Sequence, residues 1–211
     1  NKTFGAVDVG GASTQIAYEV DSLNDATFSR YIEGCRFDIF SISFLGLGQD
    51  RARNSMDGFA GGHNNICYPK GYNDSGYNGN FNYAECFSAY SDVTKSYDVV
   101  KQLKQIEGEA VFIGFSSVYY TADFLKITDN PVTDSAYGGA VQDICNKNYD
   151  ELRKSYSSIP DKYLSAYCAN SVYLQNLLFS PLNYNLNAYT IYALDRMGGK
   201  EITWSVGATV D

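Results

Sequence analysis

Histidine is scarce in this sequence, and closely spaced CxxC pairs of cysteines are lacking. Its 211 residues include 1 His and 5 Cys, and no two cysteines form a CxxC pair. Because a structural zinc site needs about four closely spaced His or Cys ligands, we expect none here. His63 has no partner ligands near it in the sequence, so we interpret it as a solvated loop residue.

Long apolar runs and excess positive charge are also lacking. No run approaches the ~18 residues of a membrane span, so we expect no span in this chain. The 16 Lys and Arg against 24 Asp and Glu give a net charge of −8 and a pI near 4.6. Nucleic-acid binding usually needs a basic face, so we expect no nucleic-acid partner. A nucleotide remains possible, because a glycine-rich turn or a metal can hold phosphate on an acidic protein.

The sequence has no charged-then-apolar leader and no initial Met. It opens Asn1-Lys2-Thr3-Phe4 and passes at once into an apolar segment typical of a strand. We therefore expect this chain to belong to a longer protein.

Apolar and aromatic residues are plentiful enough for a core. Hydrophobic residues make up 45% of the chain, charged residues 19%, and there are 19 Tyr, 12 Phe and 1 Trp. Such a composition indicates a folded chain of domain size rather than a disordered one.

The cysteines bear on the cellular compartment. They are Cys35, Cys67, Cys86, Cys145 and Cys168, accompanied by two sequons, Asn1-Lys2-Thr3 and Asn73-Asp74-Ser75. We expect bridges Cys67–Cys86 and Cys145–Cys168 with Cys35 left over, in a secreted or luminal glycoprotein. The alternative is five reduced cysteines in a cytosolic core.

The order of predicted elements indicates an α/β layer fold. We expect strands at 4–9, 14–20, 37–44 and 110–115, and helices at 47–59, 83–106, 134–156 and 161–179, with a short helix or strand at 188–197. Residues 60–85, rich in Gly, Asn and Tyr, are interpreted as a surface excursion pinned by cysteines rather than by a core.

The sharpest chemical feature is Asp8-Val9-Gly10-Gly11-Ala12-Ser13-Thr14-Gln15. An acid near the end of a strand suits a divalent cation held through water, and two glycines let a ligand approach backbone amides. Successive amides can form an anion-binding nest, and Gln15 can orient a water. The alternative is an ordinary glycine hairpin tip with a capping serine.

This motif resembles the fourth conserved region of the apyrase or CD39-like family of ecto-nucleoside triphosphate diphosphohydrolases. Four further stretches resemble family blocks in the same order: Ser43–Asp50, Phe115–Leu125, Lys162–Cys168 and Ile202–Ala208. The resemblance covers the whole chain. It implies that residues 1–211 are the C-terminal, actin-like or ribonuclease H-like lobe, a mixed sheet flanked by helices with a Cys-pinned insert at about 60–90.

The resemblance also implies roles for individual residues. Asp8 would hold Ca²⁺ or Mg²⁺ through water, Gly10, Gly11, Ala12 and Ser13 would bind phosphate, and Ser13 and Gln15 would position the attacking water. Tyr120 and Tyr167 would stack the base, the alternative for each being core filling. Trp204 would pack near the phosphates or between domains, and Gln49 stands where some relatives have a basic residue. Cys145–Cys168 matches a family disulfide, whereas Cys35 has no counterpart.

Two parts of the family site have no match in this sequence: the phosphate turn of the N-terminal lobe and the glutamate that acts as general base. Glu19 and Glu33 are in the wrong places to substitute. The resemblance thus implies one half of a nucleoside tri- or diphosphate hydrolase, inactive without its N-terminal lobe in the same or a separate chain. The alternative is a non-catalytic nucleotide- or glycan-binding, or structural, extracellular module.

Overall fold

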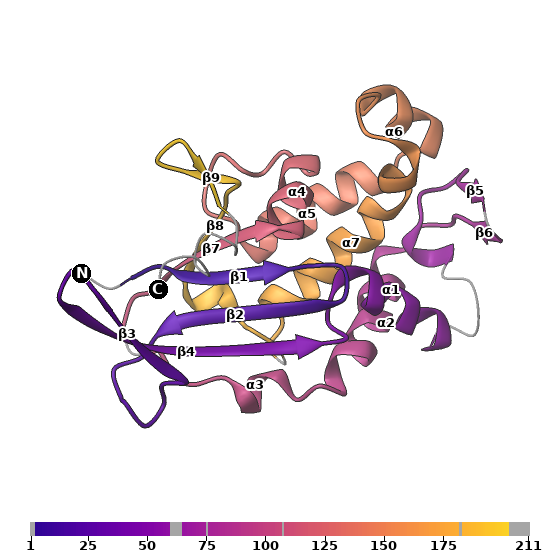
Figure 1. The fold of residues 1–211 in the computed structure, drawn as a ribbon. Helices are drawn as coiled ribbons and strands as arrows, with labels where there is room; N and C mark the ends of the chain where they lie inside the picture. Colours follow the sequence, from indigo (N-terminus) through magenta and orange to yellow (C-terminus); the bar gives the residue numbers. More distant parts are fainter. Residues whose placement is uncertain (1–2, 60–64, 75, 107, 182, 203–211) are drawn as a thin grey trace.

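A single mixed sheet organises the chain. The computed structural model describes residues 3–59, 65–74, 76–106, 108–181 and 183–202. Six strands pair in the order β3-β4-β2-β1-β7-β8, and helices pack beside them (Figure 1). The strands are β1 (Gly5–Val9), β2 (Ser13–Glu19), β3 (Phe28–Ile32), β4 (Cys35–Leu45), β7 (Val111–Ser116) and β8 (Thr190–Ala193). The first four pair antiparallel, and β7 and β8 run parallel to β1, which confirms the predicted α/β class.

The two faces of β1 and β2 differ in burial. Val7 and Val9 of β1 and Ile16 of β2 are fully or almost fully buried in the core, whereas Asp8 and Gln15 are half-buried on the opposite face. Successive side chains of a strand point to opposite faces, so the apolar alternation places these polar residues together. Strand β7, between β1 and β8, is buried on both faces, as parallel strands usually are.

The helices form a layer around one long buried helix, α7. The helical elements are α1 (Gln49–Phe59), α2 (Tyr83–Lys95), α3 (Val99–Gln102), α4 (Ser117–Phe124), α5 (Asp134–Cys145), α6 (Tyr149–Ser155), α7 (Asp161–Phe179) and the 3₁₀ turns η1 (Asn65–Cys67) and η2 (Leu186–Ala188). Helix α7 contacts α1, α2, α4, α5 and α6, and every residue from 168 to 179 is buried. A helix covered on all sides carries apolar residues all round.

The polar residues of α7 are satisfied by neighbouring elements. Asn176 accepts from the Thr94 hydroxyl of α2 at 3.0 Å, and Gln175 accepts from the Tyr83 hydroxyl at 2.9 Å. Because a buried amide without a partner costs free energy, these bonds allow polar side chains inside the helical layer.

Two predicted helices are each divided in the structure. The stretch 134–156 breaks at Asn148, whose capping box with Glu151 starts α6 as a new helix. The stretch 83–106 breaks after Lys95, where Asp98 takes a left-handed conformation with φ of 46°. Apolar periodicity continues across both breaks, which is why continuous helices were predicted wrongly.

The remaining strands were missed or placed loosely. Strand β3 was not predicted, and the segment 188–197 begins at the last residue of η2 and contains β8 and the first strand of a small hairpin. That hairpin pairs β9 (Arg196–Met197) with β10 (Lys200–Glu201), and a second pairs β5 (Asn73–Asp74) with β6 (Tyr77–Asn78). Strands of only two residues are too short to show the apolar alternation by which a strand is predicted from sequence.

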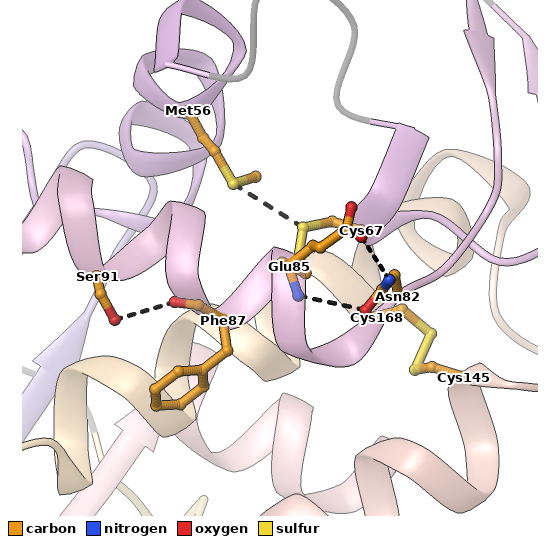
Figure 2. The surroundings of a disulfide bond; sticks show 9 residues. Met56, Cys67, Asn82, Glu85, Phe87, Ser91, Cys145 and Cys168 are labelled. Carbon is orange, nitrogen blue, oxygen red and sulfur yellow. Dashed lines mark hydrogen bonds between the residues drawn. A yellow bond between two sulfur atoms is a disulfide. The ribbon is translucent and has the colours of Figure 1, made fainter.

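Both expected disulfides form, and Cys35 is free and exposed. Figure 2 shows Met56 of α1 pointing toward Cys67, with the two sulfur atoms 3.9 Å apart, and the Cys145–Cys168 bridge nearby. The insert is also held by stacked tyrosine rings, Tyr68 on Tyr72 with centroids 5.3 Å apart. Helix α2 begins at Tyr83 and buries Cys86, so the last part of the expected insert belongs to the helical layer.

Some sequence predictions lie outside the described residues: His63, Trp204, Asn1 of the first sequon and Ser75 of the second. Of the fifth family block only Ile202 is described. Within the part of the chain that is described, no helix has the length and apolarity to cross a membrane.

Removing the Cys145–Cys168 bridge should destabilise the protein, whereas removing the free thiol should not. The bridge spans 23 residues. Closing a loop of that size stabilises the folded state by about 3 kcal/mol through the unfolded chain. We expect Cys145→Ala with Cys168→Ala to lower the free energy of unfolding in urea by about that amount. The control is Cys35→Ser, and equal unfolding midpoints for both variants would contradict a structural bridge.

Candidate functional site

The turn between β1 and β2 forms the floor of a surface hollow. Its cavity of about 510 Å³ is lined by Ala6, Asp8, Gly10, Ser13, Gln15, Ala17 and Phe115. Asp8 lies opposite Gln15 in the strand pairing, and the Gly10 amide donates to the Ser13 carbonyl at 3.0 Å. The structure thus brings Asp8, Gly10, Ser13 and Gln15 together, as the sequence predicts.

The carbonyl groups of this turn are bound by the amides that begin α1. Four amides donate to three carbonyls: Gly46 to Ala12 at 2.8 Å, Gln49 to Gly10 at 2.9 Å, Asp50 to Gly11 at 3.0 Å and Arg51 to Gly11 at 3.1 Å. Figure 1 shows the connection from β1 to β2 lying beside α1. A peptide unit points its N–H away from its C=O, so with these carbonyls bound on the α1 side we expect amides of the turn to face away from α1. Outward amides in succession are the feature of an anion-binding nest.

Gly48 makes this close contact possible. A Cβ at position 48 would lie 2.3 Å from the Ser13 nitrogen and 2.4 Å from the Ala12 backbone. A Cβ at Gly11 would lie 2.6 Å from Asp50 Oδ2, which is the end of a movable side chain. The backbone contact at Gly48 cannot relax in that way, so only glycine fits there.

The Gln15 amide is held by two hydroxyls. Its Nε2 donates to Ser13 Oγ at 2.8 Å and to Ser43 Oγ of β4 at 2.7 Å. With the nitrogen engaged on both serines, the carbonyl oxygen of the amide is oriented as an acceptor for a water or ligand. Ser43 was not predicted as a site residue, because its place opposite Gln15 depends on the β2–β4 register.

Asp8 carries an unsatisfied oxygen. Its Oδ1 is buried and has no hydrogen-bond partner among the described residues. A carboxylate oxygen in this state fits a water molecule of a hydrated cation, because Mg²⁺ and Ca²⁺ prefer oxygen ligands. No cluster of three or more His, Cys, Asp or Glu side chains occurs in the described ranges. A cation would therefore meet Asp8 largely through its own water molecules.

A second cavity of about 470 Å³ lies among three helices. It is lined by Gln49, Asp50 and Arg53 of α1, by Ser117, Tyr120 and Thr121 of α4, and by Lys162, Tyr163, Ala166, Tyr167 and Asn170 of α7. Tyr120 and Tyr167 thus share one cavity, although they come from different helices. Asp50 belongs to this cavity and also covers Gly11 of the turn, so the two cavities are neighbours.

Tyr167 is fixed by packing, while Tyr120 is open. The Tyr167 ring stacks on Phe124 with centroids 4.7 Å apart and planes 13° apart, and the Tyr120 side chain is 57% exposed. Burial, with smaller contributions from Asp123 and Tyr120, raises the pKa of Tyr167 above its usual value. The Tyr167 phenol is therefore neutral at physiological pH, with one ring face taken up by Phe124.

Several groups in this cavity were not predicted from the sequence. Arg53 donates to Asn170 Oδ1 at 2.7 Å and to Asp50 Oδ1 at 2.6 Å, which joins α1 to α7. Thr121 is 1% exposed, and its hydroxyl has no partner among the described residues. Ser117 lies three residues before Tyr120 on α4, so helical spacing could have suggested it. The contact of this cavity with α1 could not be predicted in that way, because it depends on how the helices pack.

The two glutamates considered from the sequence lie away from the turn. Glu19 Oε2 accepts from the Thr3 amide at 3.1 Å, at the far end of β2. Glu33 lies in the turn between β3 and β4 with φ of 50°. Neither lines the hollow beside Asp8.

Comparison with known proteins gives consistent matches. A family profile described as the GDA1/CD39 (nucleoside phosphatase) family matches residues 1–211. Ectonucleoside triphosphate diphosphohydrolase 2 of Gallus gallus is 28% identical over 98% of this chain and 50% of its own length. Probable apyrase 5 of Arabidopsis thaliana is 25% identical over 99% of this chain and 51% of its own. The chain thus spans about half the length of these curated relatives.

A crystal structure of nucleoside triphosphate hydrolases from Neospora caninum shares the fold. It superimposes on 99% of this chain and 56% of its own, with a TM-score of 0.60 and 11% sequence identity. At that identity the match shows the fold alone, and it supports the actin-like arrangement expected from the sequence.

Replacing Gly48 should distort the turn. In Gly48→Ala the new Cβ meets the Ser13 and Ala12 backbone, so we expect a loss of about 1–3 kcal/mol in the free energy of unfolding. The matched control is Gly139→Ala on α5, where a Cβ meets nothing within 4 Å. Helix propensity should stabilise that variant by about 0.5–1 kcal/mol. Thermal unfolding measures both, and equal midpoints would contradict the close contact at Gly48.

Proposed function

The chain belongs to the GDA1/CD39 (nucleoside phosphatase) family, and from that premise we propose that it supplies half of the active site of a nucleoside tri- and diphosphate hydrolase. Its contribution is one phosphate-binding turn, an aspartate for a divalent cation and an aromatic cavity for the base. The chain would form the C-terminal lobe of the enzyme over residues 1–211, and the N-terminal lobe would complete the site.

The observation that carries this proposal is the binding of the turn carbonyls by the start of α1. With these carbonyls bound on the α1 side, the N–H groups of the same peptide units would face away from α1, beside the hollow lined by Asp8, Ser13 and Gln15. Amides of this kind bind the oxygens of a phosphate without needing a basic side chain. This explains how a protein with a net charge of −8 can take a polyanionic substrate.

The neighbouring cavity suits the base. Tyr167, backed by Phe124, and the exposed Tyr120 offer aromatic surface for stacking. Stacking is tolerant of base identity because every base has a π face, so broad base specificity is expected. The Thr121 hydroxyl, which has no partner among the described residues, adds one polar group that a bound nucleoside can satisfy.

In the reaction, Gln15 and Ser13 would orient the attacking water, and the turn amides would hold the phosphate. Positioning and charge neutralisation are what phosphoryl transfer chiefly requires. A Ca²⁺ or Mg²⁺ ion near Asp8 would supply additional neutralisation of phosphate charge. The bond between the Gln15 nitrogen and both serine hydroxyls keeps its carbonyl oxygen aimed as an acceptor for a water proton.

The general base would come from elsewhere. Asp8 is the only carboxylate among the described residues that line the hollow. If Asp8 serves the cation, no group there remains to take the water proton, and losing a base slows a reaction by about 10²–10⁴-fold. We therefore propose that the N-terminal lobe supplies the base and a second phosphate turn, and that this chain alone is inactive.

The disulfide bridges bear on the cellular compartment of the protein. Two disulfides and relatives named as ecto-enzymes support an extracellular or luminal protein. Trp204, which lies outside the described residues, would pack near the phosphates.

Substituting Gln15 should separate hydrolysis from folding. With the chain expressed together with the N-terminal lobe, Gln15→Leu should lower kcat for ATP and ADP by about 10²-fold, because the water loses its acceptor. Phosphate release with Ca²⁺ or Mg²⁺ measures this effect. Gln142→Leu on the exposed side of α5 is the matched control and should leave kcat unchanged.

Three outcomes would contradict the assignments. Full activity of Gln15→Leu would remove Gln15 from the water site, and full activity of Asp8→Ala at low cation concentration would remove Asp8 from the cation site. Nucleotide binding by the paired lobes without hydrolysis would favour a non-catalytic module.

A further inference from the structure

One buried carbonyl group, that of Leu47, accepts two hydroxyls from distant elements. The Tyr173 hydroxyl of α7 donates to it at 2.5 Å, and the Thr14 hydroxyl of β2 donates to the same oxygen. All three residues are completely shielded from solvent. The sheet, the segment before α1 and the central helix therefore meet at a single oxygen atom.

Leu47 lies inside the segment that binds the phosphate turn. Gly46 and Gln49 on either side donate their amides to turn carbonyls, and Gly48 packs against the Ser13 backbone. Two of these residues are glycines, and Gly46 has φ of 102°, so the segment has many conformations open to it in the absence of contacts. The two hydroxyls on Leu47 select the conformation in which the amides reach the turn.

Helix α7 also carries the aromatic cavity. Tyr167 lies six residues before Tyr173, which is about 9 Å along the helix axis. The helix is fixed by the Cys145–Cys168 bridge and by its buried amides. One rigid element thus holds both the stacking ring and the group that reaches the phosphate turn.

We propose that Tyr173 is a positioning residue for phosphate binding, acting through the Leu47 carbonyl on the amides of the β1–β2 turn. The proposal rests on the proposed function, because it takes the turn as the phosphate site. It assigns to a buried core tyrosine a role in affinity for the phosphate part of the substrate and none in affinity for the base.

Removing only the hydroxyl leaves the packing in place. In Tyr173→Phe the ring keeps its contact with Tyr90, whose centroid lies 5.2 Å away, and Leu47 still accepts from Thr14. No buried acceptor is orphaned, so the variant should fold. A hydrogen bond of this kind contributes about 1 kcal/mol, which corresponds to about a fivefold change in an equilibrium constant.

The test measures the affinities of this chain, expressed together with the N-terminal lobe, for pyrophosphate and for adenosine, by NMR titration in the presence of Mg²⁺. Tyr173→Phe should weaken pyrophosphate binding about fivefold and leave adenosine binding within about twofold. The control is Tyr137→Phe on α5, which removes a buried hydroxyl that has no partner among the described residues. It should leave both affinities unchanged.

A second pair of variants checks the same oxygen from the other side. Thr14→Ser keeps the hydroxyl and should retain pyrophosphate binding, whereas Thr14→Val should weaken it as Tyr173→Phe does. A readout without ligand is also available, because the amide resonances of Gly11 and Ala12 should move in Tyr173→Phe and not in Tyr137→Phe.

The outcomes separate the two proposals. If the unaltered chain, paired with the N-terminal lobe, binds no pyrophosphate, the proposed phosphate site is wrong. If it binds pyrophosphate but Tyr173→Phe binds equally well with unmoved Gly11 and Ala12 resonances, the positioning role is wrong. Equal weakening of pyrophosphate and adenosine, with a lowered melting temperature, would also overturn it, because that pattern indicates a purely structural residue.

Discussion

The first turn of α1 has amides without partners inside the helix, and the β1–β2 turn has carbonyls without partners inside the hairpin. Each satisfies the other through bonds of 2.9–3.1 Å. A helix N-terminus often binds an anion directly, but here its amides bind backbone carbonyls of the β1–β2 turn instead. The arrangement needs glycine at position 48, where any side chain would meet the backbone of Ser13.

Helix α7 is a buried element that contacts the segment before α1. Its buried length lies among five other helices, and its exposed start carries Tyr163 and Tyr167 into the aromatic cavity. The Tyr173 hydroxyl binds the Leu47 carbonyl, in the segment whose amides hold the β1–β2 turn. The same helix therefore lines the aromatic cavity and, through Tyr173, binds the segment whose amides hold the β1–β2 turn.

Much of the site could be predicted because its residues are contiguous. Asp8, Gly10, Ser13 and Gln15 lie within one turn and its two strands, and strand alternation alone puts them on one face. Ser43 and Thr121 could not be found in this way, because one depends on strand register and the other on the meeting of α4 with α7. The helix boundaries at Asn148 and Asp98 were missed because caps and left-handed residues interrupt an apolar pattern without changing its period.

The sequence by itself determined which residues form the β1–β2 turn, the two disulfide pairs and the α/β class, since these follow from local residue order and from resemblance over the whole chain. Only the tertiary structure decided which way the turn amides point, because that depends on carbonyls bound by a helix some 40 residues further along. It also decided the aromatic cavity, where Arg53 joins Asn170 across 117 residues of sequence. Contacts of that separation arise from how helices pack on the sheet, and no local pattern encodes them.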